Sequence, residues 1–141
     1  MTDDGWPRWV PSRPDIDLRI VRSAGRRHGE SFVWSRVTTE LPADPRLHAC
    51  AWAYLSDLTL LGTVRLPYEP EPAAPRSWQM LTLNHAIWFH RPLRADRWLL
   101  QHQYSPTAAA GRGLSMASVF NQEGELVSSL SQEGVGREFP V

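Results

Sequence analysis

The sequence predicts an α+β fold in which one long central helix is wrapped by a curved antiparallel β-sheet. Only one segment, about residues 45–61, has the spacing of an apolar helix, and segments with strand periodicity stand on both sides of it. The chain of 141 residues, 42% hydrophobic and 21% charged, has the size and composition of one globular domain with a single core. We therefore expect one folded unit over residues 15–141, preceded by an arm or linker over residues 1–14.

The arm is inferred from Pro7, Pro11 and Pro14, because three prolines so close together prevent regular helix. Two strands are predicted after it. "IDLRIV" (residues 16–21) alternates apolar and polar positions, and "SFVWSRVTTEL" (residues 31–41) is rich in aromatic and β-branched side chains. The segment between them, "RSAGRRHGE", contains two glycines and is typical of a turn.

The helix carries a start signal and a stop signal. Asp44 can cap its N-terminus, Pro45 suits the first helical position and Gly62 suits the exit, so we expect a helix over residues 45–61. A helix that is apolar on most sides is typically buried, and Cys50 within it is expected to be a packed thiol. The apolar positions are Leu47, Ala51, Tyr54, Leu58 and Leu61 in one stripe, with Trp52 and Leu55 well away from it.

The C-terminal half is predicted to consist of strands joined by turns. "RLPYEPEPAAPRS" (residues 65–77) contains four prolines and should be an irregular connection, whereas "NQEG" (residues 121–124) predicts a hairpin with Gly124 free to adopt a positive φ. Antiparallel strands that curl around one long buried helix form a hotdog-type domain, whose remaining apolar surface predicts dimerisation. The expected strands cover residues 78–91, 98–105, 113–120 and 125–135.

Composition disfavours several classes of partner and compartment. Fifteen acidic and fifteen basic residues balance to a formal charge of zero, which disfavours nucleic-acid binding. No segment approaches the roughly 20 apolar residues of a membrane span, and the acidic, proline-rich N-terminus does not match a signal peptide. Cys50 is the only cysteine, so no intramolecular disulfide is expected, and a cytoplasmic location fits.

Familiar catalytic and cofactor motifs are also absent from the sequence. It contains no G-x-S-x-G elbow, no phosphate-binding loop and no dinucleotide glycine pattern. His85 and His90 fall on opposite faces of one predicted strand, which argues against zinc, and we expect neither metal nor cofactor. The small residues of "SPTAAAGRG" (residues 105–113) suit either a close approach to a ligand or a bulged strand corner.

Asp57 is the only carboxylate between Leu47 and Leu61. At a ~100° step per residue it lies about 80° from the centre of the apolar stripe, at the border of the packed face. A carboxylate partly removed from water needs hydrogen-bond donors. Such an acid is either a catalytic base or a structural group that caps a loop or pairs with an arginine.

Thr82 and Gln132 are the other polar residues of interest. Strand alternation places Thr82 and Asn84 on one face and Leu83 and His85 on the other, although threonine is common in strands. Gln132 shares a face with apolar Leu126 and Leu130, so its amide should point into the interior. A structural hydrogen-bonding role is the alternative for that amide.

Four segments together resemble, in order and spacing, the C-terminal half of the acyl-CoA thioesterase II (TesB-like) family. They are "YLSDLTLL", "LTLNHAIWFHRPLRADRWLL", "SPTAAAGRG" and "GELVSSLSQEGVGR", and the resemblance extends over residues 13–137. Members of this family are similar to two hotdog folds in tandem and hydrolyse acyl-CoA thioesters to free acid and CoA without a cofactor. The resemblance implies that this chain is a thioesterase acting on acyl-CoA in lipid metabolism.

The family's catalytic acid, its Thr or Ser and its Gln fall on Asp57, Thr82 and Gln132. By resemblance, the acid accepts a proton from an attacking water, and the other two position water or substrate. Where the family has an Asp-His pair, this chain has Asn84 and His85, so a neutral amide lies next to the site. Two arginines, Arg91 and Arg112, could meet the phosphates of CoA, but exposed arginine is usually just solvated.

The family's first hotdog half is not matched, so we expect the chain to form a homodimer or to pair with another hotdog chain. The leading hypothesis is an acyl-CoA thioesterase. A rival hypothesis is a non-catalytic acyl-CoA-binding subunit that completes a complex with a separate half. A dehydratase that uses His85 is weaker, because the histidine-centred motif of those enzymes is absent.

Overall fold

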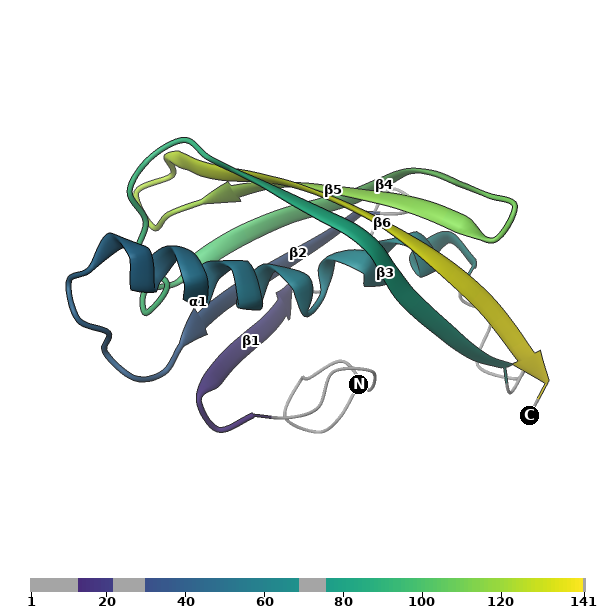
Figure 1. The fold of residues 1–141 in the computed structure, drawn as a ribbon, viewed down its shortest axis with the longest axis horizontal. Helices are drawn as coiled ribbons and strands as arrows, with labels where there is room; N and C mark the ends of the chain where they lie inside the picture. The colour runs from purple at the N-terminus through teal and green to yellow at the C-terminus, as the bar shows by residue number, and fades with distance from the viewer. Residues whose placement is uncertain (1–12, 22–29, 69–75, 141) are drawn as a thin grey trace.

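The computed structural model describes residues 13–21, 30–68 and 76–140. Within them, six strands accompany one α-helix that leads into a 3₁₀ helix (Figure 1). In chain order the elements are β1 (Ile16–Val21), β2 (Glu30–Val37), α1 (Pro45–Asp57), the 3₁₀ helix η1 (Leu60–Tyr68), β3 (Arg76–Phe89), β4 (Leu99–Ala109), β5 (Arg112–Phe120) and β6 (Leu126–Pro140).

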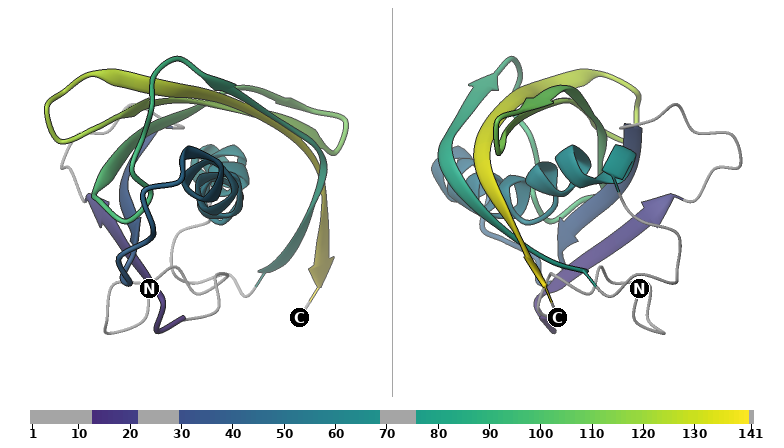
Figure 2. Two further views of the ribbon diagram at one scale, coloured as in Figure 1. Left: turned by 60° about the vertical axis from the view of Figure 1, so that its left-hand side comes forward. Right: turned by 90° about the vertical axis from the view of Figure 1, so that its right-hand side faces the viewer.

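The six strands form one antiparallel sheet in the order β1-β2-β4-β5-β6-β3. Figure 2 shows the sheet curving around α1, which is seen end-on within it. The sheet is not closed, so β1 and β3 are its two edges. This is the predicted architecture of one helix wrapped by a curved antiparallel sheet.

The core lies between α1 and the concave face of the sheet. Trp52 and Leu55 of α1 are fully buried there, and Trp52 Nε1 donates a hydrogen bond to Ser128 Oγ at 3.3 Å. Burying side chains of this size contributes about 2 kcal/mol each, which anchors the helix to the sheet. The strands contribute the buried apolar residues Ile16, Leu18, Val33, Leu99, Ala117, Val119, Val127 and Leu130.

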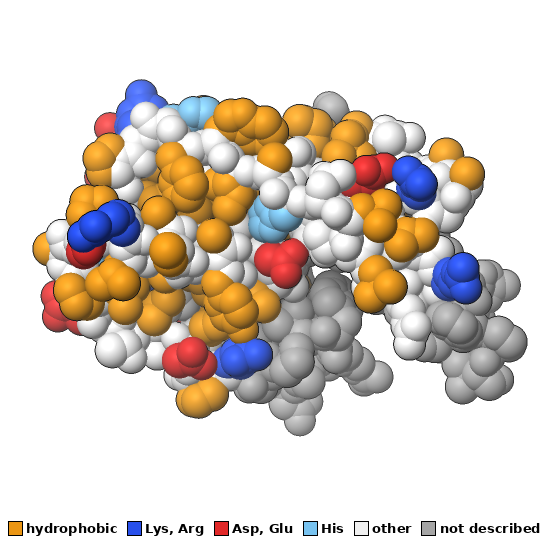
Figure 3. Space-filling view, in the orientation of Figure 1, with side chains coloured by type: hydrophobic (Ala, Val, Ile, Leu, Met, Phe, Trp, Pro, Cys, Tyr) orange, Lys and Arg blue, Asp and Glu red, His pale blue; other side chains and the backbone are white. Residues whose placement is uncertain are grey.

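The expectation that the apolar stripe is buried is only partly confirmed, because Leu61 is buried and Ala51 and Leu58 are partly buried against the core, but the rest of the stripe is exposed. Leu47 and Tyr54 are 46% and 45% exposed, and Cys50, predicted to be packed, is also exposed. The sheet covers one side of α1 only, and that side carries Trp52 and Leu55, which lie away from the stripe. Figure 3 shows hydrophobic side chains gathered over the outer side of α1. A large apolar surface is therefore uncovered in the single chain.

The predicted helix end at residue 61 is also wrong, because α1 ends at Asp57. The N–H of Leu58 bonds to the carbonyl of Leu55 at 3.3 Å, and the chain continues as η1 through Gly62. Thr63 Oγ1 donates to the carbonyl of Leu60 at 2.9 Å, the three-residue spacing of a tight 3₁₀ turn. Residues 65–68, expected to be irregular, belong to η1, and residues 69–75 of that connection lie outside the described residues.

The predicted strands are confirmed with shifted ends, and the β5–β6 hairpin has Gly124 at φ +81° as expected. The "SPTAAAGRG" segment is a bulged strand corner. β4 continues through it with a register shift between Tyr104 and Thr107, and Gly111 turns the chain at φ +74°. Residues 22–29 of the predicted turn and residues 1–12 of the predicted arm lie outside the described residues.

Candidate active site

Asp57, Thr82 and Gln132 meet where the C-terminus of α1 approaches β3 and β6. The Gln132 amide nitrogen donates to Asp57 Oδ1 at 2.5 Å and to Thr82 Oγ1 at 2.8 Å. These residues are separated by 75 and 50 positions along the chain. The structure therefore brings together the three side chains that the sequence singled out.

Gln132 is the buried member of this trio, with 0% of the residue exposed. Its two N–H groups serve the two hydrogen bonds just described, since a primary amide carries two donors. Its Oε1 is buried without a hydrogen-bond partner among the described residues. The prediction that this amide points into the interior is confirmed, and the side chain holds an acid and an alcohol in one fixed arrangement.

Asp57 is the open member, because its side chain is 52% exposed. Oδ1 is held by Gln132, while Oδ2 accepts no hydrogen bond from the described part of the chain. Asp57 is also the last residue of α1, where the negative end of the helix dipole disfavours an anionic side chain. An acid placed there purely for stability would be poorly placed.

A β-bulge at Leu83 overturns the predicted faces of β3. Thr82 pairs with Gly134 and Asn84 pairs with the adjacent Glu133, so Leu83 is an extra residue opposite no partner. Asn84 consequently points to the other face, where its Nδ2 donates to Glu133 Oε2 at 2.9 Å. The expectation that Thr82 and Asn84 share a face is wrong, because an inserted residue inverts strand alternation beyond it.

The same bulge turns His85 toward the trio. His85 Nδ1 lies 3.6 Å from Asp57 Oδ1, and His85 Nε2 lies 3.3 Å from Ser56 Oγ. Without the bulge, Thr82 and His85 would face opposite sides of the sheet, since three positions separate them. His85 therefore faces the site, and Asn84 does not.

Gly134 allows η1 to pack closely beside the site. A Cβ at this position would lie 2.5 Å from the Leu61 side chain and 3.0 Å from the carbonyl oxygen of Leu81. Only glycine leaves this room without movement of the neighbours. Glycine at this position therefore lets η1 lie close to β6 beside the site.

A second carboxylate, Asp96, lies on the β3–β4 connection beside α1. It accepts from Arg94 Nε at 2.9 Å, from Arg94 Nη2 at 2.6 Å and from the N–H of Leu41 at 2.9 Å. These bonds, chiefly those from Arg94, hold the pKa of Asp96 well below its usual range. His48 Nδ1 lies 4.0 Å from Asp96 Oδ1 and accepts from the N–H of Ala95 at 3.2 Å. The sequence reasoning did not single out this cluster.

The two arginines considered for CoA have partners within the chain. Arg91 Nη1 donates to the carbonyl of Leu126 at 2.6 Å, and Arg112 Nη1 lies 3.7 Å from Glu133 Oε1. Arg112 and Glu133 are close enough for an ion pair, which is weak at a surface. Neither contact gives these residues a role in substrate binding.

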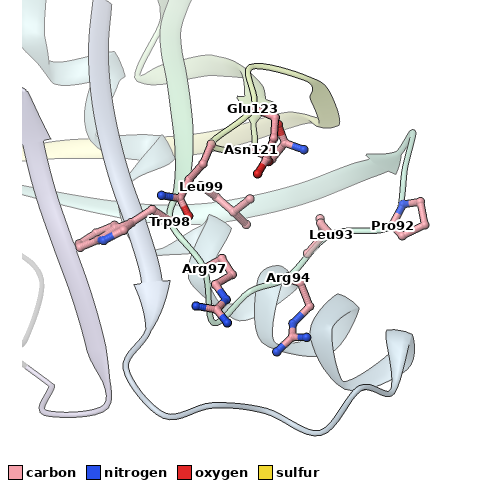
Figure 4. Close-up of a pocket in the computed structure, with 9 residues that line it drawn as sticks. Pro92, Leu93, Arg94, Arg97, Trp98, Leu99, Asn121 and Glu123 are labelled. Carbon is pink, nitrogen blue, oxygen red and sulfur yellow. The ribbon is translucent and has the colours of Figure 1, made fainter.

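A cavity of about 360 Å³ lies between the β3–β4 connection and the β5–β6 turn (Figure 4). Arg97 and Trp98 line one side, and Asn121 and Glu123 line the other. The trio takes no part in its wall. Across the described residues there is no group of three or more His, Cys, Asp or Glu that could hold a metal ion. Nor does the described part of the chain contain a helix long and apolar enough to cross a membrane.

Comparisons with known proteins show the family of the chain. The acyl-CoA thioesterase family model matches residues 11–135. Acyl-coenzyme A thioesterase 8 of Homo sapiens is 40% identical over 121 residues, which cover 82% of this chain and 35% of the human protein. Acyl-CoA thioesterase 2 of Haemophilus influenzae is 34% identical over 108 residues, covering 77% and 37%. The chain therefore spans about a third of the length of these relatives.

Solved structures give the same relationship. Acyl-CoA thioesterase II TesB2 from Mycobacterium marinum superposes with a TM-score of 0.77 at 41% identity, over 91% of this chain and 52% of that protein. Thioesterase HI1161 from Haemophilus influenzae has a TM-score of 0.61 at 11% identity, over 85% of this chain and 78% of that one, a likeness that shows the fold alone. The predicted hotdog fold is confirmed by these neighbours.

Proposed function

The chain belongs to the acyl-CoA thioesterase family, and from that premise we propose that it hydrolyses acyl-CoA thioesters to free acid and CoA. Asp57, Thr82 and Gln132 are the proposed catalytic residues. The observation that carries the proposal is the Gln132 amide, whose two hydrogen bonds bring an exposed acid and an exposed alcohol together. The substrate class rests on the family, and lipid metabolism follows from that class.

The hydrogen bonds determine which atoms are free to react. Because Thr82 Oγ1 accepts from Gln132, its own O–H remains available to donate. Because Asp57 Oδ1 is held, Oδ2 is the oxygen available to accept a proton. Hydrolysis at neutral pH needs a base beside the attacking water and a donor beside the developing oxyanion. Asp57 can serve as the base, and the Thr82 O–H can serve as the donor.

In the proposed reaction, water attacks the thioester carbonyl carbon while Asp57 Oδ2 takes one of its protons. The carbonyl oxygen becomes an oxyanion, and the Thr82 O–H donates a hydrogen bond to it. The oxyanion then reforms the carbonyl, the carbon–sulfur bond breaks, and the sulfur departs with the bonding electrons. Protonated Asp57 returns its proton to that sulfur, so the products are the free acid and CoA, and Asp57 is again a carboxylate.

A second hotdog unit paired along β3 would complete this site. β3 is an edge strand, and it carries the exposed large apolar residues Leu81, Leu83, Trp88 and Phe89 together with the exposed Thr82. Unpaired edges and apolar patches of this kind mark interfaces. TesB2, of which this chain covers 52%, is large enough to contain a second unit. The second unit is proposed to be another copy of this chain.

The test is steady-state release of CoA from acyl-CoA substrates of graded chain length, with the solution mass measured in parallel. The proposal expects turnover by a dimer and its loss in Asp57→Ala. Unchanged turnover by Asp57→Ala would rule out the role assigned to this acid. Tight acyl-CoA binding without release would instead favour the non-catalytic subunit. Asn84, which replaces the acid of the family pair, points away from the trio and does not favour either outcome.

A further inference from the structure

His85 is placed to act on the proposed base. It pairs directly with Gln132 in the β3–β6 register, and its side chain is 15% exposed. The Gln132 amide and His85 Nδ1 both approach the same carboxylate oxygen of Asp57, at 2.5 Å and 3.6 Å. The other nitrogen of the ring is 3.3 Å from Ser56 Oγ. Ser56 and Asp57 are consecutive on α1, so the imidazole spans the last turn of the helix.

The contacts of the ring limit where its proton can sit. Ser56 Oγ lies 3.0 Å from the carbonyl oxygen of Ala53, to which its single proton can be donated, or it can donate to His85 Nε2. If Ser56 donates to Nε2, neutral His85 carries its proton on Nδ1. If Ser56 donates to Ala53, Nε2 carries a proton, and Nδ1 then presents a lone pair to the carboxylate unless the ring is cationic. A lone pair against an anion is electrostatically unfavourable, so both favourable states place an N–H between His85 and Asp57.

We propose that His85 is a positioning residue for thioester hydrolysis, which holds Asp57 Oδ1 through Nδ1–H while Ser56 holds the ring through Nε2. With Oδ1 approached by Gln132 on one side and His85 on the other, rotation of the carboxylate is restricted. Oδ2 is then the oxygen that faces water. The inference rests on the proposed function, and it adds a residue pair outside the trio.

The separation of 3.6 Å is too long for a hydrogen bond, so the contact in this structure is electrostatic. Electrostatic contacts strengthen when water is excluded, and catalytic hydrogen bonds commonly shorten when substrate binds. Thr82 is exposed and Asp57 is half exposed, so a substrate bound over the site would shield both side chains from solvent. A shift of well under 1 Å would close the contact to a bond.

Kinetic variants separate positioning from packing. Loss of one charge-assisted hydrogen bond in His85→Ala or Ser56→Ala should lower kcat about 10-fold or more while KM stays within about 2-fold. His85→Asn places an amide near the Nδ1 position and should recover most of kcat, whereas His85→Gln reaches toward Ser56 and should recover less. His90→Ala is the matched control, because His90 directly follows β3 but is exposed and bonded to Ser129 Oγ at 2.8 Å.

Failure of the positioning role of His85 can be distinguished from failure of the proposed thioesterase function. If the wild type releases CoA but His85→Ala keeps its kcat, or His85→Asn recovers nothing, the positioning role is wrong and the proposed function stands. If the wild type releases no CoA with any acyl length, the proposed function fails and the positioning role fails with it. Nitrogen NMR of the His85 imidazole provides a check that does not depend on turnover. We expect a proton on Nδ1 in the wild type and its loss from Nδ1 in Asp57→Asn. A neutral ring protonated at Nε2 in the wild type would overturn the inference.

Discussion

Two carboxylates, Asp57 at the end of α1 and Asp96 beside the helix, each have a histidine neighbour, yet they differ in exposure and in hydrogen bonding. Asp96 and His48 lie 4.0 Å apart, and Asp57 and His85 lie 3.6 Å apart. The Asp96 side chain is 2% exposed and accepts three hydrogen bonds from arginine and backbone donors. The Asp57 side chain is 52% exposed and accepts one, from an amide.

The contrast shows that residue type and a nearby histidine do not define an active site. Asp96 has donors on both oxygens, so its lone pairs are already engaged, and it ties the β3–β4 connection to the segment before α1. Asp57 keeps one oxygen free and lies beside an alcohol. We interpret Asp96, whose two oxygens are both hydrogen-bonded, as a structural acid, and Asp57, which keeps one oxygen free within the described part of the chain, as a catalytic acid. Substitutions at the two acids should therefore have opposite effects on stability and activity.

The largest effect is expected from Asp57→Asn. The substitution is nearly isosteric but removes the proton acceptor, so kcat should fall about 1,000-fold, within the range for general bases. The free energy of unfolding should stay within about 0.5 kcal/mol or rise, because the negative charge at the helix C-terminus is removed. Initial rates of CoA release and urea unfolding measure the two quantities. A variant that loses stability instead of activity would make Asp57 a structural acid.

Asp96→Asn should give the reverse pattern. An amide in place of the carboxylate turns one acceptor into a donor, which leaves an N–H of Arg94 or the partly buried N–H of Leu41 without its partner. We expect a loss of about 2 kcal/mol in the free energy of unfolding, with kcat changed by less than about 3-fold in the folded protein. The same two measurements apply. If the folded Asp96→Asn variant lost as much kcat as Asp57→Asn, the interpretation of Asp96 as a structural acid and Asp57 as a catalytic acid would be wrong.

Part of the loss of stability at low pH should come from protonation of Asp96. Its folded-state pKa is lowered below the unfolded value of about 3.9, so the pair contributes stability that is fully present above that value. This contribution is lost as pH falls from about 4 toward the lower pKa of the folded state. The difference in the free energy of unfolding between the wild type and Asp96→Asn should therefore be smaller at pH 3 than at pH 6. An equal gap between the two proteins at both pH values would show that the ion pair does not carry the difference.

The smallest effect is expected from Asn84→Asp, which restores the acid of the family pair. Asn84 is two residues from Thr82 but faces Glu133, on the other side of the sheet from the trio. The new charge should cost about 0.5 kcal/mol through repulsion of Glu133, and kcat should change by less than about 2-fold. A large change in kcat would mean that the Leu83 bulge does not turn this position away from the site.

Sequence patterns predicted most of the fold because its signals are local. Asp44 caps α1 by accepting from the N–H of Arg46 at 2.9 Å, and Gly124 occupies the positive-φ position of its hairpin. The choice of helix face was not predictable in the same way. Both sides of α1 are apolar, and which one is buried depends on where the sheet lies.

The site was predictable in its members but not in its geometry. Resemblance to a family pointed to Asp57, Thr82 and Gln132, whereas the bulge at Leu83 has no glycine or proline to signal it. That bulge becomes visible only in the register of β3 against β6, where Thr82 pairs with Gly134 and Asn84 with Glu133. The Asp96 cluster was missed for a similar reason, since its contact with Leu41 spans 55 positions along the chain.

The central claim is that Asp57, Thr82 and Gln132 act as one unit in the attack of water on the thioester carbonyl. A double-mutant cycle on kcat, with Asp57→Asn, Gln132→Leu and the double variant, tests it most directly. The account predicts that each single variant loses activity and that the double variant loses little more than Asp57→Asn alone, because Gln132 acts through the acid it holds. Losses that simply multiply in the double variant would show that the two side chains contribute independently and would contradict the account.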